Sequence, residues 1–100
     1  MDAQIKSQWI EALRSGKYKQ GTGYLRPNEN RFCCVGVLLD VIAPDEWDGG
    51  AHRHGQIAEM PMDLRETVGL SPPQVDSLYQ MNDEYGKTFS EIADYIEANL

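Results

Sequence analysis

The sequence predicts one α+β domain over residues 1–100, mostly α-helical, with about five helices and one small β-hairpin. Apolar residues recur at helical spacing in several segments that end at glycine or proline, which is typical of short amphipathic helices. One apolar run is long enough to form a buried helix, and a turn-prone tetrapeptide separates two extended stretches. Because 100 residues can enclose one hydrophobic core but not two, these elements should form a single domain.

The N-terminal half of the chain contains two expected helices. The first should run from Ala3 to Leu13, because its apolar residues lie three or four positions apart and Gly16 follows where a left-handed cap would sit. The second should cover residues 34–42, where apolar side chains occupy most of a helical circumference until Pro44 ends the run. This second helix is expected to be the buried centre of the fold, with Gly36 allowing another backbone to approach closely.

The hairpin is expected between these two helices. Residues 18–26 and 31–34 flank the sequence Pro27-Asn28-Glu29-Asn30, and such residues favour a turn. In an extended strand, side chains alternate between the two faces, so Lys17 and Lys19 should lie on one face and Tyr18 and Gln20 on the other.

The C-terminal half begins with residues 45–60, which contain three glycines and no periodicity and are expected to form a loop. A short helix is expected from Pro61 to Val68, followed by one that starts after Ser71 and one that starts after Thr88. Ser and Thr are favoured N-cap residues, because their hydroxyl oxygens accept hydrogen bonds from the first free backbone N–H groups of a helix.

Charge is segregated along the chain. Residues 1–31 hold six Lys or Arg against three acids, whereas residues 32–100 hold three against thirteen, so the two parts carry +3 and −10. An electropositive region on an acidic molecule of net charge −7 suits a small anion better than nucleic acid or an anionic membrane. The longest apolar run is far shorter than the roughly 20 residues that cross a bilayer, and the N-terminal residues lack a signal-peptide pattern. A cytoplasmic location is therefore expected.

The region from Arg14 to Cys34 is the leading candidate for a binding surface, because basic, glycine and aromatic residues gather there. There Lys17 could contact phosphate while Tyr18 stacks on a base or ribose, with Gln20 nearby and Arg14 and Arg31 as fork-shaped donors. The alternative is that these cations only complement the dipole of the preceding helix and a solvated edge strand.

Asn82 and Asp83 form a second candidate group, between two expected helices. Either side chain could hydrogen-bond a ligand hydroxyl, as a carboxylate does for ribose in nucleotide sites. The alternative is that Asn82 caps a helix and Gly86 forms a left-handed turn before the next one.

Catalytic and metal sites have weaker support. Cys33 and Cys34 could supply a nucleophile with His52 or His54 as its base, but their spacing fits no known pairing, and free cysteine is most often a buried apolar residue. The two histidines lack further ligands at metal-binding spacing. The sequence therefore predicts no catalytic residue, no metal and no cofactor.

Three motifs resemble a family of small uncharacterised proteins common in bacteriophages and prophages. They are W-x-x-A-L-R-S-G-x-Y-x-Q from Trp9 to Gln20, F-C-C-x-G-V-L from Phe32 to Leu38, and M-N-D with F-x-x-I-A-x-x-I from Met81 to Ile96. The resemblance implies a mobile-element context, in which small acidic proteins often counter host defence.

These observations lead to one main functional hypothesis and two alternatives. The main one is a noncatalytic phage-type protein that sequesters a phosphorylated, nucleotide-derived small molecule. The first alternative is an acidic inhibitor that covers a nucleic-acid-binding surface of a host defence protein, because complementary charge speeds association. The second is an enzyme that acts on nucleotides.

Overall fold

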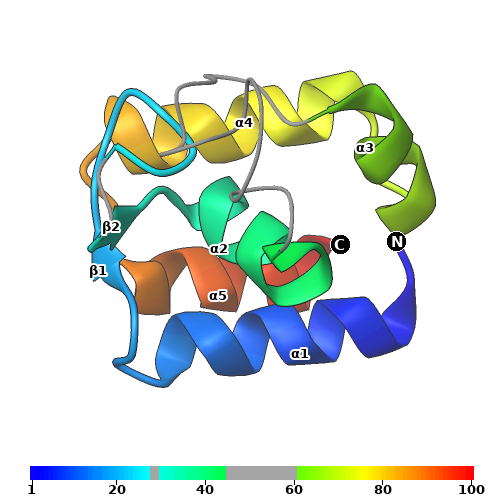
Figure 1. The fold of residues 1–100 in the computed structure, drawn as a ribbon, viewed down its shortest axis with the longest axis horizontal. Helices are drawn as coiled ribbons and strands as arrows, with labels where there is room; N and C mark the ends of the chain where they lie inside the picture. Colours follow the sequence, from blue (N-terminus) through cyan, green and yellow to red (C-terminus); the bar gives the residue numbers. More distant parts are fainter. Residues whose placement is uncertain (28–29, 45–60) are drawn as a thin grey trace.

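The structure is a computed structural model that describes residues 1–27, 30–44 and 61–100 (Figure 1). Five helices and a two-stranded sheet make up the described part of the chain, which confirms the mostly α-helical α+β class. Their bounds are α1 Ala3–Arg14, β1 Lys19–Gln20, β2 Arg31–Phe32, α2 Cys34–Ile42, α3 Met62–Val68, α4 Pro72–Asp83 and α5 Phe89–Asn99.

Helix α2 is the centre of the fold, as its apolar run predicts. Every residue from Cys34 to Leu39 is buried, and α2 contacts both α1 and α4. Figure 1 shows α2 between α4 and α1, with α5 running beside α1. The first and last helices therefore close the core around the central one.

The helix ends follow the capping rules that the sequence suggests. Ser71 and Thr88 each form a capping box, in which the hydroxyl accepts from a backbone N–H three residues later and that residue's side chain accepts from the cap. Gly69 ends α3 in the left-handed conformation, with φ of 80°. Local chemistry thus sets where these helices begin and end.

The predicted hairpin is wrong, because the two strands pair in parallel. Lys19 lies opposite Arg31 and Gln20 opposite Phe32. The connection between the strands does not fold back tightly: Leu25 is fully buried, and its carbonyl accepts a hydrogen bond of 3.0 Å from the Cys33 N–H. The chain must therefore travel into the core and return before β2 begins, which brings β2 in with the same direction as β1.

Gly36 is where this connection meets α2. A Cβ atom at Gly36 would lie 1.7 Å from the Leu25 carbonyl oxygen and 2.6 Å from its carbonyl carbon, so only glycine fits. The expected close approach of another backbone is confirmed. Its partner is a loop residue and not another helix.

Some expectations lie outside the described residues. They concern the loop at residues 45–60, with His52 and His54, and the middle of the turn at residues 28–29. Within the described ranges, none of the helices has the length and apolar character needed to cross a membrane.

Candidate functional site

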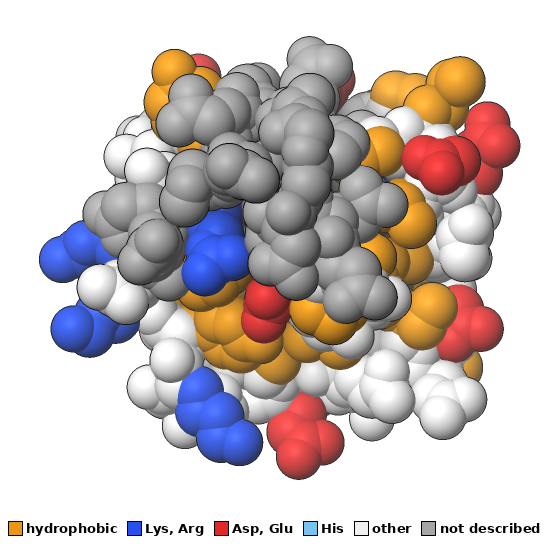
Figure 2. Space-filling model, viewed as in Figure 1, with side chains coloured by type: hydrophobic (Ala, Val, Ile, Leu, Met, Phe, Trp, Pro, Cys, Tyr) orange, Lys and Arg blue, Asp and Glu red, His pale blue; other side chains and the backbone are white. Residues whose placement is uncertain are grey.

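A basic pocket lies where the segment after α1 meets β2 and the end of α2. Its volume is about 490 Å³, within the range of small-molecule sites. Figure 2 shows Lys and Arg side chains gathered on the side of the molecule where Figure 1 places the two strands. The residues that line the basic pocket are Lys17, Tyr18, Lys19, Arg26, Asn30, Phe32 and Asp40.

Two aromatic rings line the basic pocket. The rings of Tyr18 and Phe32 meet edge to face with centroids 5.0 Å apart, and the guanidinium carbon of Arg26 lies 5.0 Å from the Phe32 centroid. Such ring pairs and cation–π contacts are favourable and directional. The arrangement holds a planar cation beside apolar surface at the pocket.

Tyr18 is fixed by a second contact. Its hydroxyl donates a hydrogen bond of 2.6 Å to Asp40 Oδ2. Partial burial, followed by the hydrogen bond to Asp40 and its negative charge, raises the pKa of Tyr18 to about 12. The phenol is therefore protonated at neutral pH and stays a donor to Asp40.

The lining of the basic pocket is net positive. In the part of its lining that the structure describes, three cations, Lys17, Lys19 and Arg26, accompany one carboxylate, Asp40. Both lysines are exposed and Tyr18 and Gln20 are half-buried, so burial alternates as predicted. The predicted common face of Tyr18 and Gln20 is not observed, because Tyr18 lines the basic pocket with the two lysines and Gln20 does not. Lysine side chains exposed at a pocket rim can reach a phosphate without first losing a structural partner.

The structure divides the candidate residues into different groups. Lys17 and Tyr18 line the basic pocket. Arg14 instead points to α5, where its guanidinium donates to Glu97 at 2.9 Å and to Asp94 at 2.7 Å. The hydrogen bonds to Asp94 and Glu97 are the main reason why the pKa of Arg14 lies above its ordinary value. Arg14 thus joins the first and last helices.

Arg31 and Gln20 also form hydrogen bonds with other residues of the protein. The Arg31 guanidinium donates to the Gln20 carbonyl oxygen at 3.1 Å. The Gln20 side-chain amide donates to Asn82 Oδ1 at 2.8 Å and to the Lys87 carbonyl oxygen at 2.7 Å. Gln20 consequently faces away from the basic pocket, toward the end of α4.

Asn82 is the centre of a buried hydrogen-bond network. Its Oδ1 accepts from the Cys34 N–H at 3.1 Å as well as from Gln20, and its Nδ2 donates to the Gly21 carbonyl oxygen at 2.8 Å and to Asp83 Oδ1 at 2.7 Å. Asp83 Oδ2 accepts from the Gly23 N–H at 3.3 Å. Because an amide side chain offers two donors and two acceptor sites, all of Asn82's capacity is used within the fold.

Several residues of the basic pocket do not belong to the predicted set. Arg26 and Phe32 come from opposite ends of the connection between the strands, and Asp40 lies on α2. Two of the additional residues have a signal in the sequence. Arg26 belongs to the excess of cations before residue 32, and Lys19 belongs to the predicted strand with alternating side chains. No local pattern marks Asp40 or Phe32, because both reach the pocket through tertiary packing.

Cys33 and Cys34 are free and buried. Cys33 is the N-cap of α2, where its sulfur accepts a hydrogen bond of 3.3 Å from the Gly36 N–H, and the Cys34 thiol donates to the Leu78 carbonyl oxygen at 3.5 Å. Burial raises the pKa of Cys33 to about 12 and that of Cys34 well above its ordinary value. Both are therefore thiols and not thiolates near neutral pH.

This burial predicts slow thiol labelling. Native protein at pH 8 should react with an aromatic disulfide reagent far more slowly than the same protein in denaturant, because the thiolate is the reacting species. Measuring the labelling rate in Cys33→Ala and Cys34→Ala separately assigns each thiol. Rapid labelling of either one in the folded protein would contradict the packing role.

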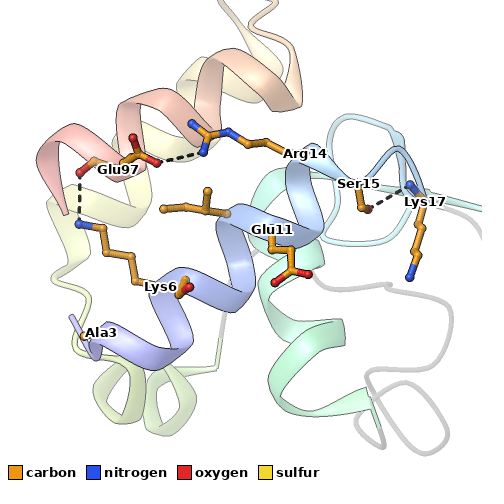
Figure 3. A pocket seen from close by; sticks show the side chains of 9 residues that line it. Ala3, Lys6, Glu11, Arg14, Ser15, Lys17 and Glu97 are labelled. Carbon is orange, nitrogen blue, oxygen red and sulfur yellow. Dashed lines mark hydrogen bonds and ion pairs between the residues drawn. The ribbon is translucent and has the colours of Figure 1, made fainter.

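Two further hollows adjoin Lys17. The larger, about 790 Å³, is an open groove between α1 and α5 (Figure 3). Two of the cations that line it already have partners, since Lys6 Nζ donates to the Glu97 carbonyl oxygen at 3.3 Å and Arg14 binds the Glu97 carboxylate. The third, Lys17, is shared with the basic pocket, and Glu11 adds a further negative charge to the groove. Despite its size, it is therefore less suited to an anion than the basic pocket.

The smaller of these hollows shares Lys17 and Tyr18 with the basic pocket. We call it the neutral hollow; its volume is about 330 Å³. It is lined by Gln8, Glu11, Ala12, Ser15, Lys17, Tyr18 and Val41.

Fold and site together define a small α-rich domain with a cationic pocket, lined in part by aromatic rings, beside its two-stranded sheet. The family described as a domain of unknown function, DUF8296, matches residues 1–77, and the chain belongs to that family. The matched range includes every residue of the basic pocket and of the neutral hollow. Neither a curated protein nor a solved structure gives a significant match to the chain.

Proposed function

We propose that the protein binds a phosphorylated, nucleotide-type small molecule in the basic pocket and sequesters it without catalysis. One observation carries this proposal: three cations and two packed aromatic rings converge on a single cavity of about 490 Å³. The cations supply charge-assisted contacts to phosphate, and the rings supply apolar surface.

The charge distribution favours a small ligand over a polymer. The basic pocket belongs to a molecule of net charge −7, so phosphates that extend beyond the pocket would meet repulsion. A mononucleotide or a similarly compact anion keeps its charge beside Lys17, Lys19 and Arg26.

Sequestration without turnover agrees with the state of the thiols. Cys33 and Cys34 are buried, and their raised pKa values keep them protonated, which disfavours nucleophilic attack. The resemblance to bacteriophage proteins supports a counter-defence role, in which removing a nucleotide-derived signal would suffice.

The test removes the two exposed lysines. Lys17→Ala/Lys19→Ala should weaken binding of a nucleoside triphosphate on the order of 100-fold, since each charge-assisted contact contributes about 1.5 kcal/mol or more. The melting temperature should change little, because exposed cations add little to stability. Isothermal titration calorimetry with the four ribonucleoside triphosphates measures the effect.

Lys87→Ala is the control for the loss of one positive charge away from the site, because Lys87 is exposed and lies outside the basic pocket. It removes one positive charge and should leave the affinity within about twofold, which separates local contacts from net charge. Wild-type protein that binds none of the nucleotides, or a double variant with unchanged affinity, would refute the proposed site. Copurification of a host protein in place of a nucleotide would favour the acidic-inhibitor alternative.

A further inference from the structure

The neutral hollow shares a wall with the basic pocket. Lys17 and Tyr18 line both cavities, so a ligand held at the basic pocket can extend past Tyr18 without leaving the protein surface. Together the two volumes, about 330 and 490 Å³, match the range of small-molecule sites. The two cavities are thus neighbours that share one fixed aromatic side chain.

The chemistry of the two compartments differs. Among the described lining residues, the neutral hollow has one cation, Lys17, balanced by Glu11, whereas the basic pocket has three cations and one carboxylate, Asp40. Ala12 and Val41 add apolar wall to the neutral hollow. Such a lining disfavours a second phosphate and accommodates an uncharged planar group.

The neutral hollow has polar side chains that can form hydrogen bonds with such an uncharged group. Among the described residues, the side chains of Gln8 and Glu11 have no hydrogen-bond partner, and both line the neutral hollow. Ser15, in contrast, is already engaged, since its hydroxyl donates to the Ala12 carbonyl oxygen at 2.7 Å and accepts from the Lys17 N–H at 3.1 Å. The Gln8 amide can donate and accept, and the Glu11 carboxylate accepts from ring or exocyclic N–H groups.

We infer that the neutral hollow is the base subsite for the ligand whose phosphates occupy the basic pocket, an inference that rests on the proposed function. The ligand is then a nucleoside phosphate and not an inorganic polyphosphate or a sugar phosphate. Lys17 and Tyr18 then lie where the phosphates of the ligand join its nucleoside, and Gln8 and Glu11 lie beside the nucleobase.

The experiment compares two probes on the same protein: inorganic triphosphate and whichever ribonucleoside triphosphate binds best. Wild type should bind the nucleotide more tightly than the inorganic ion. Gln8→Ala/Glu11→Ala should lower the ratio of the two affinities about tenfold, the cost of two lost hydrogen bonds. The ratio is the readout because removing the Glu11 charge alone strengthens the binding of both anions.

Gln4→Ala is the control, because Gln4 is an exposed residue of α1 outside both cavities, and its affinity ratio should equal that of wild type. A second variant, Ala12→Leu, narrows the neutral hollow and should lower the same ratio while inorganic triphosphate still binds. Ratios unchanged in both variants would overturn the base subsite and leave the phosphate site standing. Wild-type protein that binds neither probe would overturn the proposed function itself.

Discussion

Gly36→Ala is expected to destabilise the protein by about 3 kcal/mol, at the upper end of the usual cost of overpacking. The added methyl carbon would overlap the Leu25 carbonyl oxygen, and two backbones cannot separate as a flexible side chain can. The change acts against helix propensity, because alanine favours a helix interior over glycine by about 1 kcal/mol. Urea denaturation followed by circular dichroism measures the difference in the free energy of unfolding.

Gly86→Ala provides the comparison for Gly36→Ala. Gly86 has φ of 63°, and a Cβ there would meet no atom within 4 Å, so its cost is conformational alone and should be about 1 kcal/mol. A Gly36→Ala protein as stable as wild type would mean that the Leu25 backbone does not lie against α2.

Asn82→Leu is expected to cost about 3 kcal/mol, because it leaves buried polar groups without partners. The Cys34 N–H at the start of α2 and the Gly21 carbonyl oxygen after β1 would both lose their hydrogen bonds. The leucine side chain restores volume but no polar contact, so the loss reports the hydrogen bonds and not a cavity. Thermal denaturation by calorimetry measures it.

Asn99→Ala tests whether any asparagine of a helix would give the same result. Asn99 is exposed and donates only to the Tyr95 carbonyl oxygen, at 2.9 Å, so its removal should change the stability by less than about 0.5 kcal/mol. Equal effects of the two substitutions would show that Asn82 does not organise the core.

The helices could be predicted because their signals are local. Ser71 and Thr88 define helix starts through side chains that act within three residues, and Gly69 defines an end through its own φ. The parallel pairing of the strands could not be predicted in this way. It depends on the burial of Leu25, whose hydrogen-bond partner Cys33 follows β2.

The candidate site was predictable in part for the same reason. The gathering of basic and aromatic residues before Cys34 indicates Lys17 and Tyr18, which line the basic pocket. It could not separate them from Arg14, because the carboxylates that engage Arg14 lie 80 and 83 residues away on α5. The sequence likewise does not show that the hydrogen-bonding groups of the Asn82 amide are all occupied by internal partners.

The pairing of α1 with α5 also governs when the protein can fold during its synthesis. Trp9, Ile10 and Leu13 of α1 share one core with Ile92 and Ile96 of α5, so the apolar face of α1 has no complete cover while α5 is still unmade. We therefore expect a ribosome-bound chain to stay sensitive to protease until residues 89–99 have emerged, although residues 1–77 carry the family match. Stalled nascent chains of increasing length would show protection arising abruptly at that point.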